Sequence, residues 1–249
     1  MLSKLLRKAA PGPISAIAVE SGSRIYAVGD IHGRADLLAG IIDRIRVDMD
    51  RHPGRRATTI FLGDYVDRGP DSRSVVDMLL ALSRGEGTVC LKGNHEAVLV
   101  RFLHDPSLWD TWAAFGGVQT LRSYGLRVPT CLSREDQVRV AEEFRQALPW
   151  EHLHFLEGLA LTYISGDVVF VHAGLRPNVP MDQQEEEDLL WIRRPFLDHG
   201  EPFEYFVVHG HTPVESPEVH ANRINIDTGA YATGRLSCVV LDGHSLTFL

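Results

Sequence analysis

Short apolar runs recur along the chain, and five of them end beside glycine and side chains that bind metal ions. These runs are Ile25–Val28, Thr58–Leu62, Thr88–Leu91, Val168–Val171 and Phe206–Val208. Apolar runs of this length, bounded by glycine and polar residues, predict β-strands. Because the crevice outside the carboxyl ends of strands in an open α/β sheet collects side chains from distant parts of a chain, we expect these strand ends to form one shared site.

The segments between the first three runs have the spacing of amphipathic helices. Apolar residues recur at helical spacing over 35–49, and His52-Pro53-Gly54 ends that pattern. A second helix is predicted from about Ser72, with Asp71 or Ser72 as its cap. This β-α-β-α-β order predicts parallel strands joined by right-handed crossovers.

The region from about residue 97 to 160 predicts a helical insert. Trp109, Trp112 and Phe115 are followed by amphipathic patterns over 133–148 and 150–156. By comparison with common domain anatomy, we expect the insert to pack on the same core. The alternative is a cap that shapes a substrate cleft.

After the insert, strand patterns return. They cover Asp167–Val171, Tyr205–Val208, Arg223–Ile226, Leu236–Leu241 and Ser245–Leu249, with a hairpin turn expected at Asp242-Gly243. These strands predict a second, more antiparallel sheet that faces the first. We therefore expect one domain over residues 24–249, preceded by a poorly ordered segment over residues 1–23.

Composition narrows the class of protein. The chain has 249 residues and a formal net charge of −8, which argues against general binding to nucleic acid. The three cysteines have no paired spacing, as expected of reduced thiols in the cytoplasm. No apolar run is long enough to cross a membrane. We expect a cytoplasmic protein with no membrane, nucleic-acid or obligate protein partner.

Six residues at the predicted strand ends have metal-binding side chains. They are Asp30, His32, Asp64, Asn94, His172 and His211. Asp30 and His32 alternate on one extended segment and therefore point the same way. Asp64 carries two oxygens and can bridge two ions about 3.5–4 Å apart. The predicted division is Asp30, His32 and Asp64 on one ion, with Asp64, Asn94, His172 and His211 on the other.

Any one of these six residues would more often cap a turn or fill the core, so it is the whole set that predicts a metal site. A structural zinc site is closed and built mostly from cysteine, whereas these ligands are carboxylate, amide and imidazole groups. Such a mixture suits a catalytic centre with two divalent ions.

Neighbouring residues predict the reaction. His95 follows Asn94, and Asp67 is placed to orient His95 as a general acid. Arg68, and a second guanidinium at Arg193, can hold phosphoryl oxygens; for Arg193 a solvated surface position is the alternative. These parts suit hydrolysis of a phosphate ester, in which hydroxide held between the metals attacks phosphorus and His95 protonates the leaving oxygen.

Three motifs carry a family resemblance: Gly29-Asp30-Ile31-His32-Gly33, Gly63-Asp64-Tyr65-Val66-Asp67-Arg68-Gly69 and Gly93-Asn94-His95-Glu96. Over about residues 25–230 the chain resembles the calcineurin-like metallophosphoesterases, and more narrowly the compact bacterial phosphoprotein phosphatases. The resemblance implies an α/β, four-layer αββα sandwich of two mixed sheets. It also implies two metal ions, commonly manganese with iron or zinc as alternatives, and phosphate binding by Arg68, Arg193 and Asn94.

Departures from the family pattern refine the prediction. Pro213 stands where many metallophosphoesterases carry another metal-binding histidine, which favours the phosphoprotein phosphatase branch. Asp67 and Glu96 match that branch better than the symmetric diadenosine tetraphosphatases. His209 has no ligand role in the pattern and is interpreted as structural. For Tyr231, a core position is favoured over closure of the site.

The leading hypothesis is a protein serine/threonine phosphatase. The alternatives are a hydrolase of diadenosine tetraphosphate and related dinucleotides, or a phosphatase of phosphotyrosine or small phosphate esters. A catalytically inactive binding module is disfavoured, because no expected ligand or acid is missing.

Overall fold

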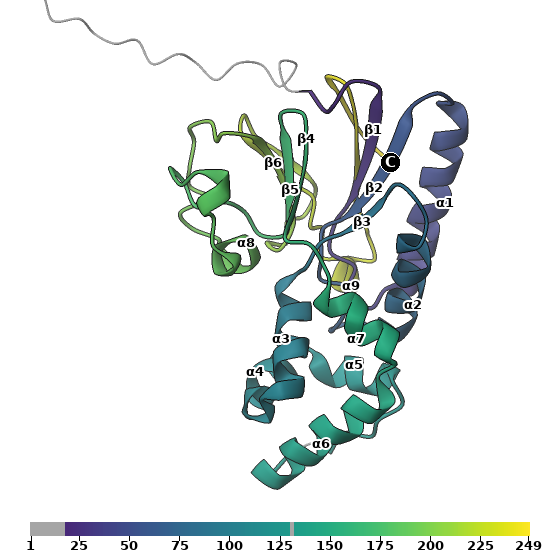
Figure 1. The fold of residues 1–249 in the computed structure, drawn as a ribbon, viewed down its shortest axis with the longest axis vertical. Helices are drawn as coiled ribbons and strands as arrows, with labels where there is room; N and C mark the ends of the chain where they lie inside the picture. Colours follow the sequence, from purple (N-terminus) through teal and green to yellow (C-terminus); the bar gives the residue numbers. More distant parts are fainter. Residues whose placement is uncertain (1–17, 130–131) are drawn as a thin grey trace, which may run out of the picture.

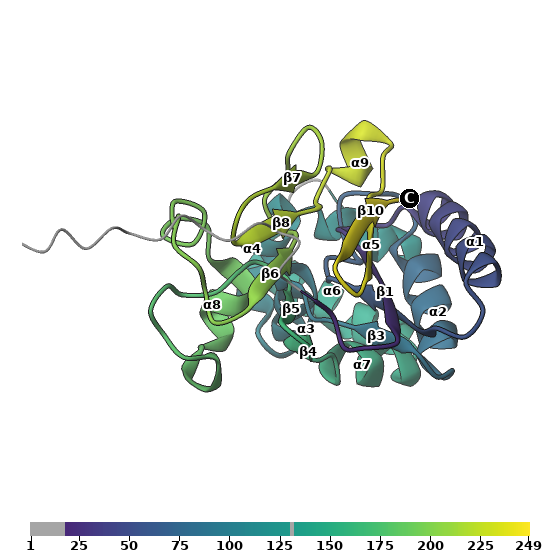
Figure 2. The ribbon, with the colours of Figure 1, turned by 90° about the horizontal axis from the view of Figure 1, so that it is seen from above.

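Two β-sheets pack face to face between outer helices. The computed structural model describes residues 18–129 and 132–249. In Figure 2, helix α8 (Glu186–Trp191), the second sheet, the first sheet and helices α1 (Ala35–Arg51) and α2 (Ser72–Ser83) follow one another across the molecule. The predicted four-layer α/β arrangement is confirmed.

The first sheet has the strand order β10-β9-β1-β2-β3. Its strands are β1 (Ser23–Val28), β2 (Arg56–Phe61), β3 (Thr88–Cys90), β9 (Cys238–Asp242) and β10 (Ser245–Phe248). β1, β2 and β3 are parallel, as the sequence predicted. β9 pairs antiparallel with β1 and forms a hairpin with β10 around the predicted turn at Asp242-Gly243.

The second sheet has the order β4-β5-β6-β8-β7. Its strands are β4 (Thr162–Ser165), β5 (Val168–Val171), β6 (Phe206–His209), β7 (Glu218–Val219) and β8 (Arg223–Asn225). The prediction that all the later strands form this sheet is wrong, because β9 and β10 complete the first sheet. The expectation of a more antiparallel sheet fails at its centre, where β5, β6 and β8 are parallel.

Alternation along the strands separates the apolar layers. Ile25 and Ala27 of β1 lie between the two sheets, whereas Tyr26 and Val28 face α1 and α2. The same alternation in β5 places Phe170 between the sheets and Val169 in the apolar layer that includes residues of α8. Asp71 caps α2 by accepting a hydrogen bond from the backbone N–H of Ser74.

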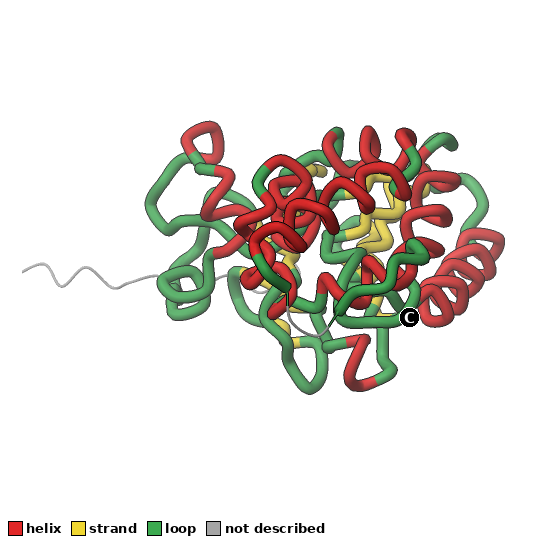
Figure 3. Tube along the Cα trace, turned by 90° about the horizontal axis from the view of Figure 1, so that it is seen from below, coloured by secondary structure: helices red, strands yellow, loops and turns green. Residues whose placement is uncertain are grey.

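The helices of the insert gather below the sheets in Figure 1, and Figure 3 shows this end of the molecule from below. They are α3 (Asn94–His104), the 3₁₀ helix η2 (Pro106–Leu108), α4 (Trp109–Ala114), α5 (Gly117–Ser123), α6 (Arg134–Ala147) and α7 (Trp150–Glu157). Phe102, Trp112 and Phe144 stack in their centre and belong to the same apolar cluster as the first sheet. The insert therefore packs on the main core. The remaining helical turns are η3 (Met181–Gln183) and α9 (Ala230–Thr233).

Of the predicted N-terminal segment, residues 1–17 lie outside the described residues, whereas Val19 is buried in the apolar layer between the sheets. Cys90 and Cys238 are buried free thiols, and Cys131 is outside the described part. None of the helices in the described ranges is long and apolar enough to cross a membrane.

Candidate metal centre

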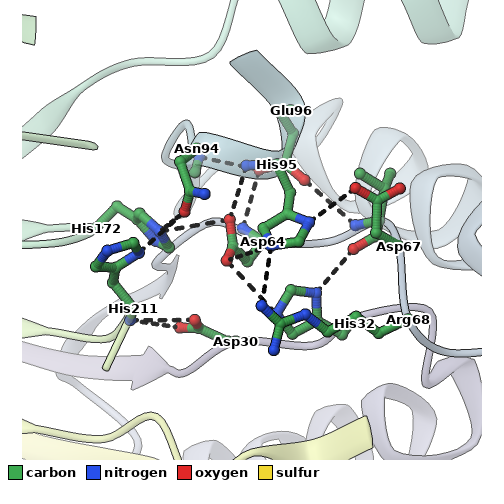
Figure 4. A network of polar contacts seen from close by, with 12 residues as sticks. Asp30, His32, Asp64, Asp67, Arg68, Asn94, His95, Glu96, His172 and His211 are labelled. Carbon is green, nitrogen blue, oxygen red and sulfur yellow. Dashed lines mark hydrogen bonds and ion pairs between the residues drawn. The ribbon is translucent and has the colours of Figure 1, made fainter. Parts of the chain in front are cut away.

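The carboxyl ends of five strands deliver the predicted ligands to one buried place (Figure 4). Asp30 and His32 follow β1, Asp64 follows β2, Asn94 follows β3, His172 follows β5 and His211 follows β6. All six residues are buried. The structure thus brings together the six side chains that the sequence singled out, although they come from segments far apart in the chain.

The loops that carry these residues have an unusual backbone. Among the described residues, six that are not glycine have a positive φ angle, and five of them lie at this site: His32, Asp64, Asp67, Arg68 and His211. Such conformations cost about 1–3 kcal/mol each and persist only where the surrounding structure enforces them. The concentration of strain marks these loop ends as functional rather than as ordinary connections.

Close backbone approach requires glycine beside the site. A Cβ atom on Gly93 would lie 2.2 Å from Oδ1 of Asp64, and one on Gly210 would lie 2.1 Å from Oδ1 of Asp30. Both distances are far below van der Waals contact. The two glycines thus let neighbouring strand ends approach the carboxylates of Asp64 and Asp30.

Asp64 lies between two groups of metal-binding atoms. Its Oδ2 is 3.5 Å from Nε2 of His32, and its Oδ1 is 3.4 Å from Nε2 of His172. The groups His32–Asp64–His95 and Asp64–His172–His211 each offer ligand atoms within 4.8 Å of one another. One oxygen of Asp64 therefore faces each group, which is the arrangement needed for a bridging ligand.

The histidines are held in the neutral form and in a defined tautomer. Nδ1 of His32 lies 2.8 Å from the carbonyl oxygen of Val66, and Nδ1 of His172 lies 3.0 Å from that of Leu62. Each Nδ1–H donates to a carbonyl, which leaves Nε2 with a lone pair directed at Asp64. Burial lowers the pKa of His32 to about 3 despite the nearby Asp64 carboxylate, so the ring is neutral and able to bind a metal.

In the second group, His172 and His211 converge on the side chain of Asn94. Its side-chain oxygen lies 2.9 Å from Nε2 of His172 and 2.9 Å from Nδ1 of His211. Burial and then the neighbouring His172 lower the pKa of His211 to about 2. An amide oxygen and two neutral imidazoles that converge in this way offer lone pairs to a common point, as a bound cation requires.

Asp30 lies beside these two groups and faces another carboxylate. It accepts hydrogen bonds of 3.1 and 3.3 Å from the backbone N–H of His211. Burial, together with repulsion from Asp227 and Asp64, raises the pKa of Asp30 well above its usual range. Asp227, which the sequence analysis did not single out as a site residue, is also buried, and burial raises its pKa to about 6.

This chemistry fits bound divalent cations. Three buried carboxylates in one place repel one another, and cations would remove that repulsion. His32, Asp64, Asn94, His172 and His211 would hold the ions, and Asp30 stays a predicted ligand because it is in neither group of converging atoms.

His95 differs from the metal-binding histidines because its ring nitrogen meets a carboxylate. Nδ1 is 2.7 Å from Oδ2 of Asp67, so Nε2 faces the centre, 3.7 Å from Oδ2 of Asp64. Burial opposes a charge on His95, but Asp64 and Asp67 outweigh burial and raise the pKa of His95. The ring is therefore suited to carry a proton at Nε2, as the sequence analysis predicted for a general acid.

Asp67 is itself held by the helical insert. Its carboxylate accepts a 2.6 Å hydrogen bond from the hydroxyl of Thr120 and hydrogen bonds of 3.1 and 3.2 Å from the indole N–H of Trp112. Asp67 is fully buried. In the sequence, Trp112 stands out only as an aromatic residue of the insert, and Thr120 does not stand out. Nothing in the sequence linked either residue to Asp67. In the structure Gly117 leaves room for the Trp112 ring, because a Cβ at this position would lie 2.4 Å from it.

Glu96 organises the loop that presents Asp64. Its Oε2 accepts from the backbone N–H groups of Gly93 and Asp64, and its Oε1 accepts from those of Tyr65 and Val66. Four backbone donors are thus satisfied by one buried carboxylate. Its role is to hold the loop rather than to bind metal.

The two predicted phosphate-binding arginines lie on different sides of the centre. Arg68 donates to the hydroxyl of Tyr231 at 2.9 Å, and its guanidinium is 3.4 Å from Nε2 of His95. Arg193 is exposed and donates to the carbonyl oxygen of His211 at 3.3 Å. Positive charge therefore flanks the centre at its His95 side and at its His211 side.

Comparison with known proteins agrees with this geometry. A family model described as calcineurin-like phosphoesterase matches residues 23–246. The chain belongs to this family. It is a metallophosphoesterase, a class of hydrolase that uses divalent metal ions, and the donor groups described above are where such ions would bind.

Relatives of this phosphoesterase include nucleotide hydrolases. The chain is 27% identical to the asymmetrical bis(5'-nucleosyl)-tetraphosphatase PrpE of Oceanobacillus iheyensis, over 86% of this chain and 87% of the relative. A crystal structure of a candidate diadenosine tetraphosphatase superposes with a TM-score of 0.63 at 22% identity, over 93% of this chain and 97% of that one. A protein serine/threonine phosphatase from Saccharomyces cerevisiae shares the fold, with a TM-score of 0.54 at 14% identity over 95% and 84%.

Aromatic side chains surround the centre of this phosphoesterase. The ring of Phe115 lies 5.4 Å from that of His95 and 5.8 Å from Trp191, and Trp191 lies 6.3 Å from His211. Tyr231 packs edge-on against His32 at 5.4 Å. The interpretation of Tyr231 as a core residue is wrong, because 38% of it is exposed and it contacts the site. We call Phe115, Trp191 and Tyr231 the aromatic rim.

His209 lies outside the two groups of ligand atoms. It is buried, its ring packs edge-on at 4.9 Å against Phe196, and its Nδ1 faces the carbonyl oxygen of Gly210. These contacts support the structural interpretation made from the sequence.

Proposed function

We propose that this metallophosphoesterase hydrolyses dinucleoside polyphosphates such as diadenosine tetraphosphate. The observation that carries the proposal is the aromatic rim. Flat rings beside a phosphate-hydrolysing centre suit a substrate that carries nucleobases, since every base has a face that can stack. The similarity to bis(5'-nucleosyl)-tetraphosphatases across most of both chains supports the same substrate class.

Each group has its own proposed role in the hydrolysis. Bound divalent cations would neutralise phosphate charge and activate the attacking water. Arg68 and Arg193 would bind phosphate oxygens from their two sides of the centre. His95 donates a proton from Nε2 to the leaving oxygen, and Asp67 keeps the ring oriented and protonated for that transfer.

A second candidate is a protein phosphatase acting on phosphoserine and phosphothreonine. The Asp67–His95 pair favours it, because an alkoxide leaving group needs a proton far more than a phosphate leaving group does. Phosphotyrosine has a phenolate leaving group, which needs less protonation than an alkoxide, and no such observation favours phosphotyrosine or other small phosphate esters.

Steady-state turnover separates the candidates. We expect the manganese-loaded protein to hydrolyse diadenosine tetraphosphate with a kcat/KM at least about tenfold above that for a phosphoserine peptide. A phosphoserine peptide that is turned over faster than the dinucleotide would contradict the proposal and support the second candidate.

A further inference from the structure

A pocket opens beside the metal centre on the side of the general acid. It has a volume of about 700 Å³ and is lined by Arg68, Phe115, Val118, Gln119 and Tyr231, among others. This volume lies within the range of about 300–1,000 Å³ found for pockets that hold small molecules. The insert contributes Phe115, Val118 and Gln119, whereas Arg68 comes from the loop after β2 and Tyr231 from α9.

The walls of this pocket combine flat rings with an unpaired amide. Phe115 and Tyr231 offer aromatic surface, and the Arg68 guanidinium lies 4.8 Å above the Tyr231 ring. The Gln119 side chain is half-buried and has no hydrogen-bond partner among the described residues. Because an amide can donate and accept at once, it pairs well with the edge of adenine. Aromatic faces with one amide suit a nucleobase better than a phosphate or a peptide chain.

The pocket lies on the side of the centre toward which the leaving group is expected to extend. Arg68 lines the pocket and approaches Nε2 of His95, and the Phe115 ring contacts the His95 ring. Since His95 protonates the departing oxygen, the part of the substrate beyond that oxygen extends toward His95 and the pocket. The nucleophile arrives from the opposite side of phosphorus in an in-line displacement.

We propose that this pocket binds the nucleoside of the leaving group, by stacking of its base on Phe115 and Tyr231 and by hydrogen bonding of its edge to Gln119. The inference rests on the proposed function and deepens it. It assigns substrate recognition to the helical insert, which also holds Asp67. In the reaction, the P–O bond to the leaving group breaks, the water oxygen bonds to phosphorus and its released proton passes to solvent, and the leaving oxygen takes the proton from His95, which solvent then restores.

Two variants and one control test the pocket. Phe115→Leu keeps apolar volume but removes the stacking face, and Gln119→Ala removes the amide. Arg122→Ala is the control, because Arg122 is exposed on α5, the helix of Gln119, and does not line the pocket. Each protein is assayed with diadenosine tetraphosphate and with p-nitrophenyl phosphate, in manganese. Inhibition by adenosine 5'-monophosphate is compared with inhibition by inorganic phosphate.

We expect Phe115→Leu to raise KM for the dinucleotide about tenfold more than it raises KM for p-nitrophenyl phosphate, as loss of one base stack predicts. Gln119→Ala should give a smaller change of the same kind. Inhibition by adenosine 5'-monophosphate should weaken in both variants, while inhibition by inorganic phosphate and both activities of Arg122→Ala stay unchanged.

The outcomes separate this inference from the function on which it rests. If the wild-type protein turns over the dinucleotide but both variants lose activity equally on the two substrates, the pocket assignment is wrong and the proposed function stands. If the wild-type protein does not turn over the dinucleotide, the proposed function fails and the pocket assignment fails with it.

Discussion

At the scale of single residues, the partner of one ring nitrogen decides what each histidine does. Nδ1 of His32 and of His172 meets a backbone carbonyl, which favours the neutral ring and leaves Nε2 able to bind a metal. Nδ1 of His95 meets the carboxylate of Asp67, which favours the protonated ring. Three buried histidines around one aspartate thus acquire two different chemical roles.

Replacing His95 tests this division. We expect His95→Asn to retain both metal ions and to lose about 10²–10⁴-fold in kcat on phosphoserine peptides, whose leaving group needs a proton. The loss should be smaller on p-nitrophenyl phosphate. Kinetics on both substrates, with metal content measured on the same sample, check the prediction. Equal losses on the two substrates would remove His95 from the acid role.

The sequence could indicate the individual candidate ligands because a residue type fixes the donor atoms of its side chain. An aspartate, a histidine or an asparagine after an apolar run shows the same donor atoms in any fold. It could not reveal Asp227 as a neighbour of Asp30, since that proximity arises only when β1 and β8 approach across the two sheets. Nor could it show that Tyr231 lies outside the core and contacts Arg68.

At the scale of elements, the insert holds the carboxylate that orients the predicted general acid. Helices α4 and α5 supply Trp112 and Thr120, the two side-chain donors to the Asp67 carboxylate besides His95. An aspartate with such partners is fixed before substrate arrives, and so is the His95 ring that it orients. Movement of these helices would therefore displace the His95 ring, the predicted proton donor.

Thr120→Val isolates this support because valine has nearly the same shape. The change removes the 2.6 Å hydroxyl donor of the buried Asp67 carboxylate, while the Asp67 N–H keeps the hydroxyl of Ser72 as a partner, so we expect the free energy of unfolding to fall by about 1–3 kcal/mol. We also expect kcat on phosphoserine peptides to fall more than kcat on p-nitrophenyl phosphate. Chemical denaturation and kinetics measure the two effects. As a control, Thr111→Val alters an exposed threonine of α4 and should change neither.

A second contact between elements predicts a pH effect on stability. Asp48 of α1 accepts hydrogen bonds from Arg24 at 2.7 and 2.9 Å and from Tyr26 at 2.8 Å, both on β1. Burial opposes the charge of Asp48, but Arg24 and Tyr26 outweigh it and lower the pKa of Asp48. A lowered folded-state pKa stabilises the fold above the ordinary aspartate pKa of about 3.9, and this stabilisation is lost as pH falls through the folded value.

Asp48→Asn should therefore lower the free energy of unfolding by about 2 kcal/mol at pH 7, and the difference from wild type should shrink as the pH falls below about 4. Urea unfolding across this range measures it. Asp50→Asn is the matched control, because Asp50 is exposed on the same helix. A difference that stays constant with pH would show that the Asp48 charge is not responsible.

The order of elements was largely predictable, and their assignment to sheets was not. The helical spacing over 35–49 and the cap at Asp71 are local signals, and both elements formed as expected. The apolar run of β9 specifies a buried strand without specifying its neighbour. β9 pairs with the edge of β1 that β2 leaves free, and only the packed structure shows which strand edge β9 meets.

At the scale of the whole molecule, metal binding and folding are linked. The buried carboxylates of Asp30, Asp64 and Asp227 repel one another until cations arrive, so the loaded fold is the more stable one. We expect manganese at about a hundred times its dissociation constant to raise Tm by about 5 °C or more, measured by calorimetry against protein treated with a chelator.

Metal content tests the assignment of individual ligands in the same samples. Asp64→Asn removes the shared ligand, so we expect it to lose both ions and most of the rise in Tm. Asp30→Asn should lose one ion. Retention of two ions by Asp30→Asn would show that Asp30 is not a ligand.

The pairing of β1 with β9 has a consequence for biosynthesis. β1 is made before its neighbour on one side, and β9, which covers that side, is made only after the insert and the second sheet. Until β9 is made, the unpaired N–H and C=O groups on this side of β1 are open to pairing with a strand of another chain.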